Sequence, residues 1–464
     1  MSENVVELLK AEASSPRTTR TYRTGSASGA GTWHVPRNTD AAGSGATEFN
    51  IGPCPGGFAG LESNLCRLER RVLEVRRYRA GDEDSLARLS ANAFGEGGLA
   101  YWERYYGGKD PRVDPDLVHL VEEDGDVRAT GTVLPLEVFV DGRPAPMGGI
   151  AAVATHAAYR RRGYAGELMR AILRTMRERG MNLSMLWPFA HAFYRAYGWE
   201  LAGEAVAYTL KPTDLPTSPE QKRVRAYRER DLPQMMELLE GEAVGYSCCV
   251  RRGEGRWREV LAREGWEAAV YEREWRLEGY ILYRMSGWRE EREPHRTLVV
   301  QELVWSTLGA WEALISFLAT QDPLVFEIKH NVPRGELLHP YLRSSYVKAE
   351  ISPEFMIRLV DVESALKTLD RSAHEPLVLE VSDDIIEENT GAYTIGDGEV
   401  VRGAEAAERI SLDVRRLAQL YAGYLPARQL ARHGLVGPSS PGALETLEAL
   451  FPLDDPWVYP PDHF

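Results

Sequence analysis

The chain has 464 residues, with 69 Asp and Glu against 55 Lys and Arg, so its formal net charge is −14. This acidic balance argues against nucleic acid as a partner and favours cationic small molecules. Hydrophobic residues make up 44% and charged residues 27% of the chain, which is typical of a globular protein, and the length predicts about three domains. The four cysteines lack metal-binding spacing, so we expect no metal site and a reducing, cytoplasmic location.

Residues 1–65 differ in composition from the rest of the chain. Ser, Thr, Gly, Ala and Arg dominate, and the sparse large apolar residues follow no period, so little surface can be buried to offset the chain entropy. We predict a disordered N-terminal extension. A natural start downstream of Met1 is the alternative, which the intact mass of the native protein decides. We expect neither a signal peptide nor a membrane span, because no apolar run approaches about 20 residues.

From Val72 onward the pattern is that of a mixed α/β domain, which we place at residues 72–211. Strands are recognised by alternating hydrophobicity and helices by apolar residues at spacings of three and four. The expected strands are 72–78, 117–122, 128–134, 136–140, 149–155 and 183–186, and the expected helices are 84–94, 163–178 and 190–197.

An internal repeat predicts a second domain of the same kind. The segment VRRYRAGD at residues 75–82 recurs as VRAYRERD at residues 224–231, and five of the eight positions are identical. Each copy precedes a predicted helix, and Pro212, Pro216 and Pro219 mark the connection between the copies. We therefore predict a duplicated α/β unit at residues 222–360. Its expected strands lie within 270–284 and 298–305, and its helices at 233–240 and 310–319.

Residues 361–464 form a third predicted domain, in which the elements have a different order. The expected elements are helices at 361–369, 412–422 and 443–450 and an antiparallel ribbon of strands at 378–381, 391–395 and 400–401. The chain ends in WVYPPDHF, residues 457–464. Because termini are usually polar and frayed, we expect this aromatic, proline-containing end to be stiff and partly packed.

The strongest functional signal is a basic loop between the strand at 149–155 and the helix at 163–178. Arg160, Arg161 and Arg162 stand at a helix start, where the dipole favours acidic side chains, so their presence indicates a bound anion. Gly163 and Ala165 leave room for a diphosphate to approach the unpaired amides of the first turn. A helix that merely begins with basic residues is the alternative.

These residues resemble a known motif. Arg160-x-x-Gly163-x-Ala165, after a strand ending at Val153–Thr155, resembles the acetyl-CoA motif of the GNAT superfamily of N-acetyltransferases. The resemblance implies that the strand pairs with the pantetheine arm and that the loop holds the pyrophosphate. The residues that it assigns to acetyl-CoA are Val153, Thr155, Arg160, Arg161, Arg162, Gly163, Tyr164 and Ala165.

A second match lies in FYRAYGW, residues 193–199, which resembles the stretch after the fifth strand of GNAT enzymes. The resemblance implies that Tyr194 protonates the departing CoA thiolate. A phenol has a pKa of ~10 and a thiol ~8.5, so that transfer is near balance. A core tyrosine whose hydroxyl has a partner is the alternative.

The domain order over about residues 72–464 is similar to that of the Eis (enhanced intracellular survival) proteins: a competent acetyltransferase copy, a degenerate copy, and a domain resembling sterol carrier proteins. The resemblance implies acetylation of aminoglycoside amines or lysine side chains, and a homo-hexamer. It also implies that the terminal carboxylate, here that of Phe464, enters the first site as the base. A carboxylate with a pKa near ~3.5 is ionised, attracts an ammonium group and can take its proton, directly or through water. A terminus that is simply packed on the surface is the alternative.

The resemblance also has weaker parts. Trp102 and Phe94 fall where the family places substrate-facing aromatic side chains. His463 occupies a position that is often acidic in the family, so one charge of the pocket is missing. The bulky segment Trp187-Pro188-Phe189 predicts a narrower pocket.

The sequence thus predicts a mixed α/β, acetyl-CoA-dependent N-acetyltransferase that transfers acetyl directly to an amine-bearing small molecule or a lysine side chain, without a metal. The second copy lacks the arginine–glycine loop, so we expect it to bind no acetyl-CoA and to act as a scaffold. Two alternatives stay open: an inert lipid or sterol carrier built on the same domains, and a peptide or protein N-acetyltransferase of different specificity.

Overall fold

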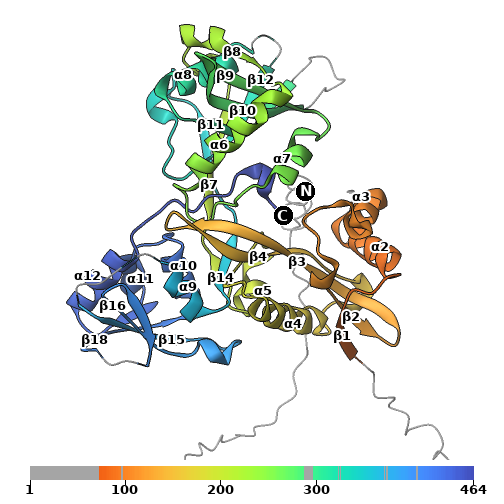
Figure 1. Ribbon diagram of the computed structural model, residues 1–464, viewed down its shortest axis with the longest axis vertical. Helices are drawn as coiled ribbons and strands as arrows, with labels where there is room; N and C mark the ends of the chain where they lie inside the picture. The colour runs from red at the N-terminus through yellow and green to blue at the C-terminus, as the bar shows by residue number, and fades with distance from the viewer. Residues whose placement is uncertain are drawn as a thin grey trace, which may run out of the picture. The chain divides into compact units, whose positions relative to one another are not determined.

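Three β-sheets organise the described part of the chain (Figure 1). The computed structural model describes residues 73–95, 98–286, 296–321, 323, 325–369, 371, 375–403 and 406–464. The predicted disordered extension at residues 1–65 and the question of the natural start lie outside the described residues. Within this part, the mixed α/β fold class predicted from the sequence is confirmed.

The first sheet has seven strands, of which only β4 and β5 pair in parallel. From edge to edge the strands are β1 (Leu73–Arg77), β2 (Val118–Glu123), β3 (Asp126–Val140), β4 (Arg143–Thr155), β5 (Leu183–Leu186), β14 (Met356–Leu359) and β6 (Glu200–Leu201). The associated helices are α2 (Glu83–Phe94), α3 (Gly98–Arg104), α4 (Tyr164–Glu178) and α5 (His191–Arg195).

Helices pack on both faces of this sheet. Along β2, Val118 and Leu120 join the cluster of α2 and α3, whereas Val121 joins the cluster of α4. Successive side chains of a strand point to opposite faces, so the two clusters lie on opposite sides of the sheet. In α4, the residues Leu168 and Ile172 are fully buried, as the helical spacing predicts.

Strand β3 is longer than the sequence indicated. Two strands, 128–134 and 136–140, were expected because Pro135 lies between them, but the structure has one strand across that proline. β2 pairs with β3 only as far as Thr132, so beyond that residue one side of β3 has no β2 partner. A proline, which lacks an amide hydrogen, is tolerated at such an edge, and Pro135 is exposed.

The second sheet repeats the arrangement, again with one parallel pair, β11 with β12. From edge to edge its strands are β8 (Val224–Ala226), β9 (Trp266–Arg273), β10 (Arg276–Ser286), β11 (Arg296–Trp305), β12 (Val325–Pro333), β7 (Glu204–Leu210) and β13 (Lys348–Pro353). Its helices are α6 (Leu232–Ala243), α7 (Glu254–Leu261) and α8 (Leu308–Ala319).

The two sheets exchange strands. β7 lies at the end of the first domain in sequence but pairs with β12 and β13 of the second sheet. β14 ends the second domain in sequence but pairs with β5 and β6 of the first sheet. Each sheet therefore needs a strand from the other half of the duplicated region.

The internal repeat has a structural counterpart in two matching ion pairs. Arg76 donates to Asp82 at 2.7 Å, and Arg225 donates to Asp231 at 2.7 Å. Each arginine also pairs with a glutamate on the neighbouring strand. The identical residues of the repeat thus form the same network twice, which is what a duplicated unit requires.

We expect Asp231→Asn to lower the free energy of unfolding by about 1–3 kcal/mol at neutral pH. Burial disfavours the ionised carboxylate, but hydrogen bonds from Arg225 and from the Arg228 amide outweigh it and hold the pKa of Asp231 below its usual value. Because the folded pKa is the lower one, this stabilisation is present above about pH 4 and is lost as the pH falls below it. Urea unfolding at neutral pH and below about pH 4 measures the difference in unfolding free energy between the variant and the wild type.

The control for this prediction is Asp84→Asn, which removes an exposed carboxylate from α2. It should change the unfolding free energy by less than about 0.5 kcal/mol. Equal losses in the two variants, or a loss in Asp231→Asn that stays the same in acid, would contradict the account of this ion pair.

The third sheet has five strands, and its apolar side chains share one core with the first sheet. In order the strands are β17 (Glu399–Arg402), β16 (Gly391–Gly396), β15 (Leu377–Ser382), β18 (Glu408–Asp413) and β19 (Val436–Pro438), with helices α9 (Val362–Thr368), α10 (Val414–Tyr421), α11 (Ala427–Arg432) and α12 (Pro441–Leu450). Leu379 of β15 and Met147 of β4 belong to the same buried cluster. Helix α10 begins after Leu412, because Asp413 caps it by accepting from the amides of Arg415 and Arg416. No helix in the described part of the chain is long and apolar enough to cross a membrane.

Candidate active site where strands β4 and β5 part

Strands β4 and β5 pair over only three positions. Residues 147–149 pair with residues 183–185, after which β4 runs on to Thr155 and β5 ends at Leu186. Within this extension Ala152 has a φ of 54°, and the register between β4 and β3 shifts. A non-glycine residue with positive φ is strained, and such strain clusters at functional sites. The backbone of residues 150–155 on the β5 side is therefore available to another partner.

The basic loop leads directly from β4 into α4. The hydrogen bonds among the described residues use none of the amide N–H groups of residues 161–165. Arg161 and Gly163 both have positive φ, 62° and 89°, a backbone conformation that occurs in anion-binding turns. The side chains of Arg160, Arg161 and Arg162 are exposed. Free amides, a helix dipole and three cations together suit a diphosphate.

The remaining residues predicted to hold the cofactor lie in the backbone or the core. Val153 and Thr155 are half-buried on β4, and Ala165 is half-buried in the first turn of α4. The Tyr164 ring is buried in the core beneath α4, and its hydroxyl interacts with the side chains of Glu123 and of Arg162 in the loop. The guanidinium of Arg162 lies 4.7 Å from the centre of the Tyr159 ring, which supports the loop from the side.

Tyr194 lies in α5, just beyond the end of β5. Its ring is buried against Phe189 and Trp199, at centroid distances of 5.2 and 6.4 Å. None of the hydrogen bonds among the described residues involves its hydroxyl. Burial raises the pKa of the phenol above its usual value, so it stays protonated at neutral pH. The side chain therefore offers a donor that the protein itself does not use.

The C-terminus lies at the point where β4 and β5 part. A Cβ atom at Gly149 would come within 2.7 Å of the Phe464 ring, so the ring packs directly on the β4 backbone. The same ring meets Trp187, which follows β5, edge to face at 4.8 Å. The expectation of a packed terminus agrees with this placement, and only a glycine at position 149 leaves room for it.

A carboxylate that the sequence did not reveal accompanies the terminus. Glu354, between β13 and β14, accepts a hydrogen bond from Trp187 Nε1 at 3.2 Å and lies 4.0 Å from His463 Nε2. Burial, which is partly offset by Glu354, lowers the pKa of His463, so the imidazole is neutral at neutral pH. Glu354 thus places an acidic group next to the position where the family pattern has one and this chain has His463. No local sequence signal could have found it, because it precedes the terminus by more than a hundred residues.

Of the two aromatic residues predicted to face the substrate, Trp102 is buried and Phe94 is half-buried. Trp102 is 2% exposed and stacks on Phe94 at 5.2 Å, within the cluster that includes Ala152 of β4. Trp102 packs in the same cluster as Ala152, where β4 has its positive φ, and little of its side chain is accessible to a ligand. Its neighbour Tyr101 is 40% exposed instead.

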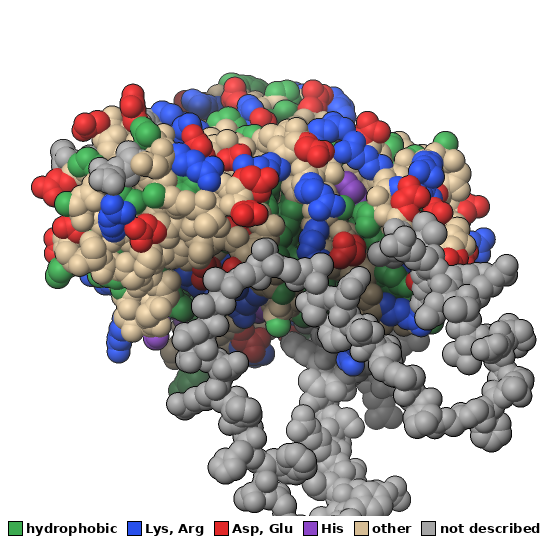
Figure 2. Space-filling view, turned by 90° about the horizontal axis from the view of Figure 1, so that it is seen from below, with side chains coloured by type: hydrophobic (Ala, Val, Ile, Leu, Met, Phe, Trp, Pro, Cys, Tyr) green, Lys and Arg blue, Asp and Glu red, His purple; other side chains and the backbone are tan. Residues whose placement is uncertain are grey.

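On the face shown in Figure 2, Lys and Arg side chains are interspersed with Asp and Glu, and no large patch of a single sign is visible. Among the described residues, no group of three or more His, Cys, Asp or Glu is arranged to hold a metal ion.

Three protein families match consecutive parts of the chain. An acetyltransferase (GNAT) domain family matches residues 74–202, a second acetyltransferase (GNAT) domain family matches residues 248–359, and the sterol carrier protein domain family matches residues 362–459. These matches confirm that two acetyltransferase domains are followed by a sterol-carrier domain, and the roles of the individual residues stay predictions.

Whole-chain comparisons agree with these matches. An uncharacterized N-acetyltransferase of Streptomyces avermitilis is 27% identical over 337 residues, which are 68% of this chain and 82% of the relative. A GCN5-related N-acetyltransferase from Anabaena variabilis has a TM-score of 0.74 at 21% identity, over 85% of this chain and 100% of that one. Eis1 from Mycobacterium abscessus has a TM-score of 0.70 at 22% identity, with the same coverage. The chain is therefore an N-acetyltransferase of the GNAT superfamily, with the fold of Eis1: two acetyltransferase domains followed by a sterol-carrier domain.

Proposed function

We propose that the chain transfers acetyl from acetyl-CoA directly to a primary amine of an aminoglycoside-like or lysine-containing substrate. In this proposal Tyr194 is the general acid and the carboxylate of Phe464 is the general base. The observation that supports it best is the packing of the Phe464 ring on Gly149 where β4 and β5 part. A chain end that merely covered the surface would have no reason to lie at that point.

The residues around the basic loop fit acetyl-CoA. The free amides of residues 161–165 and the guanidinium groups of Arg160, Arg161 and Arg162 would hold the diphosphate. The unpaired side of β4 at residues 150–155 would bind the amides of the pantetheine arm. Acetyl-CoA supplies the acetyl group as an activated thioester. Holding both reactants in one site supplies much of the rate.

The proton transfers use groups of this chain. Attack on a thioester needs a neutral amine, and the Phe464 carboxylate would take the proton that an ammonium substrate must lose. The phenol of Tyr194, kept protonated by burial, would donate to the sulfur as negative charge develops there. Because burial raises the pKa of Tyr194, full proton transfer to the thiolate is less favourable than the ordinary pKa values of a phenol and a thiol suggest, and the phenol acts mainly as a hydrogen-bond donor to the developing thiolate.

The class of acceptor follows from charge. The net charge of −14 and the carboxylates of Glu354 and the terminus favour a cationic substrate with more than one amino group.

A homo-hexamer and a cytoplasmic location belong to the same proposal. Analytical ultracentrifugation tests the hexamer, which a monomeric chain would contradict.

The experiment that tests the function follows CoA release from acetyl-CoA with aminoglycosides, polyamines and lysine-containing peptides. Turnover on aminoglycosides or lysine peptides, with the acetylated amine found by mass spectrometry, supports the proposal. Acetyl-CoA binding without turnover on any amine would contradict the acceptor class. Retention of lipid by a chain that binds no acetyl-CoA would favour the carrier alternative.

We expect alanine at Arg160, Arg161 or Arg162 to raise KM for acetyl-CoA by about tenfold each and to change kcat little. The reason is that each substitution removes a charge-assisted contact with the diphosphate, which is far from the reacting atoms. Arg174→Ala is the matched control. It removes an exposed arginine from helix α4, more than two turns beyond the loop that precedes this helix. An unchanged KM in all three loop variants would contradict the diphosphate site.

A further inference from the structure

We propose that the second acetyltransferase domain serves as a clamp for the chain's own C-terminal tail, residues 457–464. Within this clamp, we infer that Arg252 is a positioning residue, which holds Asp462 and thereby sets the place of the Phe464 carboxylate. The inference rests on the proposed function, because it assigns the carboxylate a place from which it acts as base.

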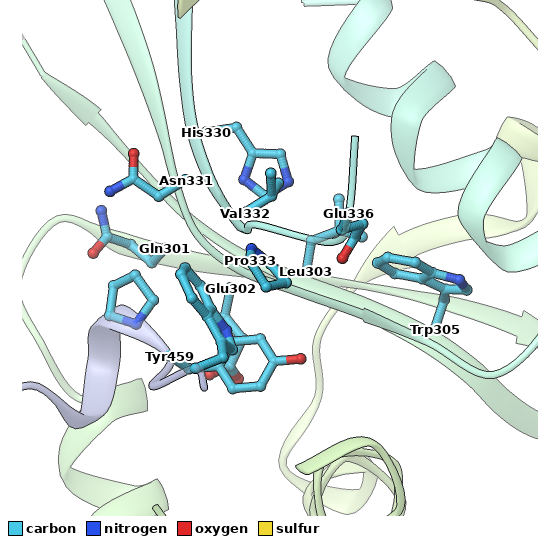
Figure 3. Close-up of a pocket in the computed structure, with 12 residues that line it drawn as sticks. Gln301, Glu302, Leu303, Trp305, His330, Asn331, Val332, Pro333, Glu336 and Tyr459 are labelled. Atoms are coloured by element: carbon cyan, nitrogen blue, oxygen red, sulfur yellow. The ribbon is translucent and has the colours of Figure 1, made fainter. Parts of the chain in front are cut away.

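The tail lies in the counterpart of the cofactor groove. In the second sheet the parallel strands β11 and β12 pair from Arg296 to Val300 and then part, as β4 and β5 do in the first sheet. Beyond that point Gln301, Leu303, Asn331 and Pro333 line one small cavity together with Trp457, Tyr459 and Pro460 of the tail. Figure 3 shows Tyr459 of the tail beside these strands. The cavity left between them is about 10 Å³, room for about one water molecule. The tail thus fills the position that a pantetheine arm would need in this domain.

A buried ion cluster fixes the tail at Asp462. Arg252 donates to both carboxylate oxygens of Asp462, at 2.6 to 3.0 Å, and to Glu302 of β11 at 2.5 and 3.0 Å. The side chains of all three residues are at most 2% exposed. Tyr280 donates a further hydrogen bond to Glu302 at 2.6 Å. Separating Asp462 from such a buried cluster would leave a buried charge without its partner, which costs free energy. The cluster therefore holds the tail in one register.

Other contacts of the tail divide between the two domains. Trp457 and Tyr459 belong to the core of the second domain, and Arg256 and Arg263 donate to the carbonyl of Pro461. Val458 belongs to the buried cluster that includes Met147 of β4, and the last two residues reach the candidate site, where Phe464 meets Gly149 and the rings of His463 and Phe464 meet Trp187. Asp462 is two residues from the end, so the carboxylate of Phe464 lies within about 7–10 Å along the chain of the fixed point.

These contacts give the degenerate domain a role in the reaction of the first. The sequence predicts a scaffold because the second copy lacks the arginine–glycine loop. The structure adds what that scaffold holds: the segment that carries the proposed base. Arg252 touches neither substrate nor cofactor in this arrangement, and it acts through Asp462.

The test uses Asp462→Asn in the full-length chain. The substitution leaves Arg252 paired with Glu302, so no charge is left unpaired and the domain should fold. We expect kcat to fall at least about tenfold while KM for acetyl-CoA stays unchanged, because the carboxylate loses its place but the cofactor site is untouched. Hydrogen exchange of tail amides should become faster, which a loss confined to catalysis would not produce.

A double variant separates positioning from structure. If Asp462 acts through the carboxylate of Phe464, adding one glycine after Phe464 to Asp462→Asn should lower kcat no further than the added glycine does alone. Arg252→Lys, which keeps the charge but loses the forked contact, should show the same defect to a smaller degree. The control is Arg225→Lys, which weakens an ion pair of the same domain away from the tail and should lower the melting temperature while leaving kcat unchanged.

The outcomes distinguish the clamp from the function on which it rests. The clamp alone would be overturned if the added glycine lowers kcat while Asp462→Asn keeps the wild-type kcat. It would also be overturned if the tail amides of Asp462→Asn exchange hydrogen at the wild-type rate. The clamp would also be overturned if the fold-losses in kcat of the two single changes multiply in the double variant, because the two changes would then act independently. An added glycine without effect would overturn the role of Phe464 and the positioning role of Arg252 with it.

Discussion

Adding one glycine after Phe464 is expected to lower kcat for amine acetylation by about 10²-fold or more, with little change in KM for acetyl-CoA. The added residue replaces the carboxylate by an amide, which is not a base, and moves the new carboxylate by about 3.5 Å. The ring of Phe464 packs on Gly149 and Trp187, so there is little space for the chain end to readjust. Initial rates of CoA release at saturating acetyl-CoA measure the effect.

Phe464→Leu is the matched control for that extension. It keeps the terminal carboxylate and removes the aromatic ring that packs on Gly149 and Trp187. Its kcat should fall by less than about tenfold, since the base remains. An extended chain that keeps more than half of the wild-type kcat would remove the terminal carboxylate from the mechanism.

Tyr194→Phe is expected to lower kcat by about 10²-fold, again with KM for acetyl-CoA unchanged. The ring and its contacts with Phe189 and Trp199 are retained, and only the hydroxyl is lost. Because that hydroxyl makes none of the hydrogen bonds among the described residues, its removal should not lower the melting temperature. A loss of activity with unchanged stability is the result that a donor to the leaving thiolate predicts.

Tyr421→Phe provides the comparison. This buried tyrosine of α10 shares a hydrogen bond with Thr368 at 2.7 Å, far in sequence from the basic loop. Its removal should lower stability by about 1 kcal/mol and leave kcat unchanged, which is the opposite pattern. Wild-type kcat in Tyr194→Phe would exclude Tyr194 as the acid and would favour the alternative of a purely structural tyrosine.

Local pattern was sufficient to predict the elements that carry the cofactor loop. The apolar spacing of α4 and the short buried run of β5 each identify one element, and the repeat at residues 224–231 identified the duplication. The exchange of β7 and β14 between the sheets was not predictable. β14 is four residues long, and which sheet a short apolar strand joins depends on partners far away in the chain.

The candidate site was only partly visible in the sequence, for a related reason. The basic loop and Tyr194 were found because their spacing is local. Arg252 and Asp462 are 210 residues apart, and charged residues are rarely fully buried, so nothing in the sequence paired them. Trp102 was expected to face a substrate because of its position in the chain, but its burial depends on how α2 and α3 pack on the sheet.

The pH dependence of kcat/KM for a lysine-containing peptide tests the central claim most directly, in the wild-type chain and in the chain with one added glycine. A lysine amine has a pKa of ~10.4, so between about pH 6 and about pH 9 the free substrate is an ammonium ion. If the carboxylate of Phe464 removes its proton, the wild-type value should be constant over this range, and that of the extended chain should rise about tenfold per pH unit. Profiles with the same slope in both chains would contradict the terminal carboxylate as the base.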